Sequence, residues 1–208
     1  MSNLTDFFPS GGGGGLTPKF QEFNASGTFT PSQALIDAGG YIEVFLVAGG
    51  GSGASRSVAA GGAHGGETFL KKMYLTSTNN VAVTVGAGGT FSSGNTTLGN
   101  TGGNSSFNGS TAGGIDLTAN GGDGATSSSS SSRSSSLSSS WGSYNDSSTA
   151  NASAGPGVFG YGAGGAVGSY YYGSSRTITP NSGQGGYTQS NGTGTGGGSG
   201  YCLIKWYE

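Results

Sequence analysis

Glycine makes up 47 of the 208 residues of this chain, and much of it lies in runs such as Gly11–Gly15 and Gly194–Gly200. Each glycine in a helix interior costs about 1 kcal/mol relative to alanine, so such runs exclude long helices. They also lack the strict every-third-residue spacing of collagen. A turn or two over Ser32–Ala38, directly after Pro31, is the helix that we expect. The sequence therefore predicts an all-β fold.

Three segments alternate apolar and polar residues with the period of two that is typical of half-buried strands: 41–47, 80–85 and 201–207. In the first of them, Ile42, Val44 and Leu46 fall on one face. Weaker strands are expected at 27–30, 67–75, 105–107 and 115–119. The first and last strong strands lie far apart in the chain, yet both have the pattern of core strands. We therefore expect one sheet system, a small β-sandwich-like core with long Gly-rich excursions between its strands.

The Gly-rich excursions have two physical interpretations, and both remain open at this stage. Runs such as Gly49–Gly53 and Gly61–Gly66 are flexible loops in the first. In the second they are extended polyglycine-type strands, which pack closely because no side chains separate them.

The composition divides the chain into an N-terminal docking arm, residues 1–30, and a Gly-rich β domain, residues 31–208. A Ser-rich insertion occupies residues 126–155 of that domain. It is a low-complexity tract around Arg133, Leu137 and Trp141.

Charge and cysteine content exclude several classes of protein. The 7 Lys and Arg residues against 9 Asp and Glu give a net charge of −2, and they form no basic patch, so we expect no nucleic-acid partner. The single cysteine, Cys202, excludes an internal disulfide. The first residues lack a basic start and a long apolar run, so we expect neither a signal peptide nor membrane insertion.

No arrangement of residues in the sequence predicts catalysis. The segment Gly49–Ala54 fits the pattern G-x-G-x-x-A, but no helix can follow it to hold a pyrophosphate. His64, the only histidine, lies in a glycine run that offers a general base no support. Cys202 lies on the apolar side of its strand and is expected to be structural. We expect no enzyme activity, no cofactor and no metal; a Ca²⁺ site that uses Asp116, Asp123 and Asp146 stays as an alternative.

Aromatic residues in polar and Gly-rich surroundings are the candidate binding residues. Exposed Tyr and Trp on Ser/Gly/Asn loops provide contact area at low entropic cost, as in antibody paratopes. The predicted receptor-binding residues are Trp141, Tyr144, Tyr170, Tyr171 and Tyr172. The alternative is that such rings pack against the glycine layers, which we favour for Phe159 and Tyr187.

Six segments of the sequence share one character, a short apolar or aromatic stretch beside one or more glycines, and they recur along the chain: Phe20–Pro31, Tyr41–Gly51, Val83–Gly89, Gly102–Phe107, Leu117–Gly122 and Gly198–Glu208. Taken in this order, they resemble the glycine-rich domains of bacteriophage tail-fibre and tail-tip proteins. The Ser-rich insertion departs from that pattern.

The resemblance implies a virion protein, often trimeric, at a tail extremity or fibre tip. Its expected partners are other tail proteins and a bacterial surface glycan or outer-membrane protein, for which it would be the host-surface adhesin. The alternative is a structural virion component without a receptor of its own: a tail tip, a fibre connector or a capsid decoration. A silk-like surface or matrix protein is the third hypothesis.

Overall fold

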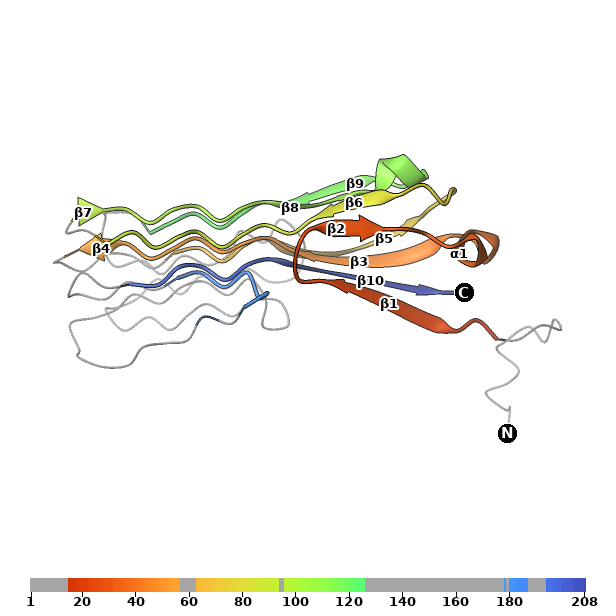
Figure 1. The fold of residues 1–208 in the computed structure, drawn as a ribbon, viewed down its shortest axis with the longest axis horizontal. Coiled ribbons are helices and arrows are strands. Elements are labelled where there is room, and N and C mark those ends of the chain that lie inside the picture. Colours follow the sequence, from red (N-terminus) through yellow and green to blue (C-terminus); the bar gives the residue numbers. More distant parts are fainter. Residues whose placement is uncertain (1–14, 57–62, 94–95, 126–177, 179, 187–193) are drawn as a thin grey trace, which may run out of the picture.

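The computed structural model describes residues 15–56, 63–93, 96–125, 178, 180–186 and 194–208. The described chain is elongated, with paired strands in one half and extended, wavy segments in the other (Figure 1). The strands form two four-stranded sheets in which every pairing is antiparallel. The fold is all-β, as predicted.

The first sheet has the strand order β1 (Pro18–Phe23), β10 (Tyr201–Tyr207), β3 (Tyr41–Val47) and β5 (Thr68–Tyr74). Its centre joins the two strong strands that lie farthest apart in the sequence. Leu203 of β10 is paired with Phe45 of β3, and the pairing continues along the whole of both strands. The expectation that both ends of the chain contribute to one sheet is confirmed.

The second sheet has the order β2 (Gly27–Phe29), β6 (Val81–Thr84), β8 (Ser105–Asn108) and β9 (Asp116–Ala119). A 3₁₀ turn, η2 (Gly109–Ala112), joins β8 to β9. Two short strands, β4 (Ser55–Arg56) and β7 (Thr96–Thr97), pair with each other away from both sheets.

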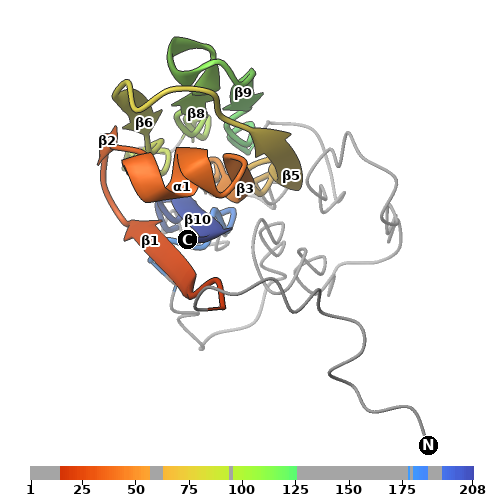
Figure 2. The same cartoon turned by 90° about the vertical axis from the view of Figure 1, so that its right-hand side faces the viewer.

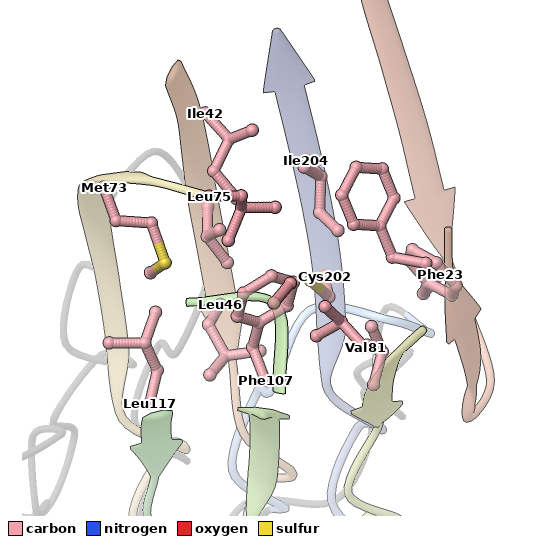
Figure 3. Close-up of a cluster of buried hydrophobic side chains, with 14 of the residues drawn as sticks. Phe23, Ile42, Leu46, Met73, Leu75, Val81, Phe107, Leu117, Cys202 and Ile204 are labelled. Carbon is pink, nitrogen blue, oxygen red and sulfur yellow. The ribbon is translucent and has the colours of Figure 1, made fainter. Parts of the chain in front are cut away.

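The core lies between the two sheets and follows the predicted alternation. Ile42, Val44 and Leu46 are completely buried on one face of β3. Figure 3 shows Ile42 and Leu46 in one buried cluster with Val81, Phe107 and Leu117 of the second sheet, and Val44 belongs to the same cluster. Burying each such side chain contributes roughly 1.5–3 kcal/mol. The sandwich therefore has a small but conventional apolar core.

The helix α1 (Gln33–Asp37) is as short as its sequence predicts. The Ser32 hydroxyl accepts a hydrogen bond from the Leu35 N–H at 3.0 Å and caps its N-terminus. Gly39 and Gly40, with φ of +100° and +71°, turn the chain after it. Figure 2 shows α1 across the end of the sandwich. None of the helices in the described ranges is long and apolar enough to cross a membrane.

Residues 18–29, within the segment expected to be a docking arm, form strands β1 and β2. β1 pairs along β10, and backbone hydrogen bonds in both directions between Thr17 and Glu208 extend this pairing. The Ser32 hydroxyl and Lys19 also reach the Glu208 carboxylate. The sandwich therefore begins at residue 17, and a docking role for the residues before it stays a prediction.

Candidate functional site

The glycine-rich segments prolong the strands of the sandwich. We number them in chain order: tract 1 (48–53), tract 2 (63–67), tract 3 (86–89), tract 4 (99–103), tract 5 (120–125), tract 6 (182–186) and tract 7 (194–200). Tracts 1, 3 and 5 follow β3, β6 and β9, whereas tracts 2, 4 and 7 lead into β5, β8 and β10. Only tract 6 continues no described strand.

Tract 1 donates its backbone N–H groups to three different neighbours in turn. Ala48 and Gly51 donate to Glu67 and His64 of tract 2. Gly49 and Ser52 donate to Gly103 and Asn100 of tract 4, and Gly50 and Gly53 donate to Gly198 and Thr195 of tract 7. Every third residue therefore points to the same neighbour, which is the threefold repeat of a polyproline-II-type helix. In each pair the partner number falls as the donor number rises, so these neighbours are antiparallel to tract 1.

The carbonyls of tract 1 accept from the remaining three tracts. Gly50 accepts from Gly89 of tract 3 at 2.8 Å, and Gly51 accepts from Gly186 of tract 6 at 2.7 Å. Gly49 and Ser52 accept from Gly122 and Ala125 of tract 5. Tract 1 is thus a central strand surrounded by six others, and the backbone of this central strand needs no side chain as a partner.

The six outer tracts also hydrogen-bond to one another, and these bonds close a ring in the order 2, 5, 4, 3, 7, 6. One bond per contact illustrates it: His64 N–H to Asp123, Gly102 to Gly122, Gly103 to Ala87, Gly197 to Gly89, Gly198 to Gln184, and Gly66 to Gly183. We call the seven tracts together the glycine lattice. The packed polyglycine interpretation of these runs is the one that the structure has.

The close packing of the lattice depends on the glycines at its inner contacts, which carry no Cβ. A Cβ on Gly51 would lie 2.1 Å from the carbonyl oxygen of Asp123. In the sandwich, by contrast, side chains hold stacked sheets about 10 Å apart. Where the side chains stop, the layer of tracts 7, 1 and 2 hydrogen-bonds directly to the layer of tracts 3, 4 and 5. The glycines therefore merge two sheets into one bundle.

Buried polar groups mark the junction between sandwich and lattice. The Ser105 hydroxyl, fully buried, donates to the Val47 carbonyl at 2.7 Å and accepts from the Gly86 N–H at 2.9 Å. It thereby links β8, β3 and tract 3. The buried Glu67 carboxylate accepts from both the backbone and side-chain nitrogens of Asn120, each at 2.9 Å. These contacts fix the register in which tracts leave the two sheets.

The chain reverses at the end of the lattice that is farthest from α1, which we call the distal end (Figure 1). There tract 1 ends and tract 2 begins, tract 3 ends and tract 4 begins, and tract 6 ends and tract 7 begins, so three connections of the chain start and finish at this end. Tract 5 also ends there, at residue 125. The β4–β7 pairing joins the first two of these connections. Several connections are thus gathered at one tip.

The predicted receptor-binding residues Trp141, Tyr144, Tyr170, Tyr171 and Tyr172 lie outside the described residues. Their segment leaves tract 5 at the distal end and precedes tract 6. Sequence reasoning missed the distal connections at 54–62 and 90–98 as a group. The sequence does contain a signal for them. Each connection lies between a glycine run that follows one strand and a glycine run that precedes the next strand.

The structure gives the candidate chemical residues ordinary structural positions. The Nδ1 atom of His64 lies 3.4 Å from the Asp123 carboxylate at the lattice surface. Burial raises the pKa of the Cys202 thiol to about 12, which suits an inert core residue. Asp116 accepts from the Ser110 N–H at 2.9 Å, and Asp146 lies outside the described residues. The described part of the chain holds no cluster of three or more metal-ligating side chains.

The dinucleotide-like segment Gly49–Ala54 is mostly tract 1 of the lattice. Its N–H groups, which would have to face a pyrophosphate, are donated to neighbouring tracts instead. The match to G-x-G-x-x-A is therefore a consequence of glycine content.

Comparison with protein-family models identifies the family of the chain. The family model of a glycine-rich domain matches residues 24–207, so the chain belongs to this glycine-rich domain family. The match spans the second sheet, the whole lattice and all strands of the first sheet except β1. No curated protein matches the chain.

Proposed function

We propose that this member of the glycine-rich domain family is a bacteriophage tail-fibre or tail-tip protein that binds the host surface through its distal end. The observation that carries the proposal is the polarity of the molecule. Thr17, where the described pairing begins, and Glu208 lie together at the sandwich end, whereas the connections between tracts gather at the opposite tip. Such a molecule is attached at one end and makes contact at the other.

The lattice suits this role because backbone hydrogen bonds hold it together. The connections at the distal end contribute none of the described bonds of tract 1. Side chains of these connections could therefore serve recognition without disturbing the bonds of tract 1, just as loops on a rigid scaffold carry function in other folds. Surface glycans fit the aromatic residues of the sequence, because sugar faces stack on Trp and Tyr rings. An outer-membrane protein is the alternative receptor.

The proposed binding end can be tested without assuming which residues bind. Leu98 lies at the distal connection and is 49% exposed, whereas Ile115 lies beside η2 on the sandwich and is 46% exposed. We would introduce Leu98→Cys and Ile115→Cys separately and attach a bulky polymer to each thiol. The buried native Cys202 stays unlabelled. Cell adsorption should be lost for the Leu98 conjugate and retained for the Ile115 conjugate; equal adsorption by both would contradict the proposal.

The predicted receptor residues need their own test. We expect Trp141→Ala and a triple Ala variant of Tyr170, Tyr171 and Tyr172 to reduce saturable binding to intact bacteria by about tenfold or more, the range of a lost hot spot. Ile115→Ala is the control for loss of an exposed apolar side chain. If both aromatic variants bind like the wild type, these residues do not belong to the site. The proposal that the distal end binds the host would then be decided by the polymer conjugates alone.

The alternative function is that of a structural tail or capsid component without a receptor. In that case the residues before β1 should be needed for incorporation into virus particles. Deleting residues 1–14 stops short of Thr17 and so keeps the backbone pairing with Glu208. Loss of this variant from virus particles, with normal folding, would support docking through the N-terminal segment. Normal incorporation would exclude that segment as the anchor.

A further inference from the structure

The first sheet carries large apolar side chains on both of its faces. One face forms the core, and we call the other, turned away from the second sheet, the outer face. Phe20, Leu70, Tyr74 and Tyr207 lie on the outer face with exposed fractions between 52% and 69%. Large exposed apolar side chains gathered on one face are a feature of interaction sites in soluble proteins. The outer face is therefore a candidate interface of the sandwich.

The strand register arranges charges across the middle of the outer face. Reading from β1 to β5, one row is Phe20, Lys205, Glu43 and Lys72. The Lys72 Nζ lies 3.2 Å from Glu43 Oε1, and the Tyr41 hydroxyl donates to the same oxygen at 3.0 Å. This row therefore has one acidic side chain near the centre and basic side chains on either side of it.

Apolar and aromatic side chains flank this charged row on both sides. The row nearer the lattice is Glu22, Leu203, Phe45 and Leu70. At the other side, Pro18 is paired with Tyr207, and Tyr41 with Tyr74. The two Tyr rings of the second pair are 5.4 Å apart, edge to face. The face is thus a central charged stripe between two mainly apolar stripes, one of which ends in Glu22 at its β1 edge.

This pattern is complementary to itself about a twofold axis that runs along the strands between β10 and β3. Rotation reverses each row, so Lys205 faces Glu43 of the second copy and Glu43 faces its Lys205. Phe20 meets Lys72 of the second copy, a cation above an aromatic ring. Leu203 meets Phe45. We propose that the outer face pairs with the same face of a second copy of this chain, forming an isologous dimer.

The dimer would orient both molecules in the same direction. The axis runs along β3 and β10, whose backbone continues into tracts 1 and 7. Two sheets packed face to face keep their strands within about 30° of each other. Both distal ends would consequently point to the same side. The inference stands without the proposed receptor role, and its twofold symmetry differs from the trimer that the family resemblance implies.

The size of the face sets the expected strength of association. Four strands of six or seven residues cover roughly 400 Å² at about 4.8 Å between strands and 3.3 Å per residue. A standard interface buries about 800 Å² on each partner. The face is about half of that size, so we expect a weak dimer that forms only at high protein concentration.

Sedimentation of the full chain across a concentration series tests the proposal. The wild type should shift from monomer to dimer as its concentration rises. Lys205→Glu places a carboxylate opposite Glu43 of the second copy, and Glu43→Lys places an ammonium opposite Lys205. Each should raise the dimer dissociation constant by about tenfold or more, because like charges then face each other across the interface.

The double variant Lys205→Glu with Glu43→Lys should restore dimerisation, but Lys205 and Glu43 are also paired within each chain, so this variant restores the fold's own charge pair as well. A mixture of the two single variants is the decisive test: each chain keeps its own like-charge pair, whereas opposite charges face each other across the interface. The mixture should form a heterodimer, an outcome that repaired folding could not produce.

Ile115→Glu, an equally exposed apolar position outside the first sheet, should associate like the wild type. A monomeric wild type at every concentration, a trimer, or charge variants that associate normally would each overturn the proposal. A double variant that stays monomeric while folded would do the same.

Discussion

A Cβ on Gly50 would lie 2.1 Å from the carbonyl oxygen of Gln184. Gly50 belongs to the central tract of the lattice, and Gln184 to an outer tract that is far away in the sequence. No real Cβ approaches a backbone oxygen so closely, and backbone cannot rotate away as a side chain can. The two tracts are therefore neighbours only because residue 50 is glycine.

Gly50→Ala should consequently destabilise the protein by on the order of 3 kcal/mol, because overpacking forces the backbone of tract 6 away from tract 1. Chemical denaturation would measure the loss. Gly196→Ala is the matched control within the lattice, since its Cβ would meet its nearest atom, the Gly89 carbonyl oxygen, at 3.0 Å. A smaller loss is expected there; equal losses would show that the close approach is not what makes residue 50 sensitive.

Ser105→Ala should weaken the junction between the sandwich and the lattice. It removes the hydroxyl that serves both the Val47 carbonyl and the Gly86 N–H. Leaving buried backbone groups without partners costs roughly 1–3 kcal/mol each. The free energy of unfolding should fall by that order, with faster amide exchange at Gly86. Ser106→Ala, on the other face of β8 and half-buried, should change neither quantity appreciably.

The thiol of Cys202 should react only when the protein opens. It is fully buried, and burial raises its pKa to about 12, so the reactive thiolate is scarce at pH 8. A thiol reagent should label native protein slowly, and denaturant should accelerate labelling in proportion to the unfolded population. The exposed Leu98→Cys position, labelled at once, is the internal comparison. Rapid labelling of the wild type without denaturant would place Cys202 outside a closed core.

Asp116 should stabilise the fold at neutral pH and not in acid. Hydrogen bonds from the Ser110 backbone and side chain lower the pKa of its carboxyl below the ordinary 3.8. A carboxyl with a lowered folded-state pKa stabilises the fold above its unfolded pKa and loses that effect as the pH falls through the folded value. Asp116→Asn should therefore lower Tm at pH 7, and the difference from wild type should shrink as the pH falls through the lowered folded-state pKa of Asp116. A Tm difference that stays constant with pH would mean that the variant loses packing and not an interaction of the charged carboxylate.

Period-two alternation predicted the strands of this fold because it reports burial on one face. It placed 41–47 and 201–207 correctly, and these segments form β3 and β10 with the expected residues inward. β1 was missed: its residues alternate, but only Phe23 at its end is buried. An edge strand whose outer face is exposed lacks the full signal.

The sequence allowed packed polyglycine strands as one of two interpretations of the glycine runs. It did not predict which tracts lie beside one another. Glycine has no side chain, so a tract such as 48–53 carries no pattern that identifies its neighbours. The hydrogen bond from Gly53 to Thr195 joins residues that only the folded sandwich brings together. The distal end was missed for the same reason, since it is defined by which tracts turn back beside one another.

The alignment of the lattice also determines how the molecule bears mechanical load. A force applied between the distal end and β1 runs along the tracts, whereas their hydrogen bonds lie across them. Such bonds are loaded in shear and must break together. Pulling Thr17 away from Glu208 instead opens the β1–β10 pairs one after another from their ends. The molecule is therefore strong along its length, where the lattice bonds share the load, and weak between β1 and β10, where the pairs open singly.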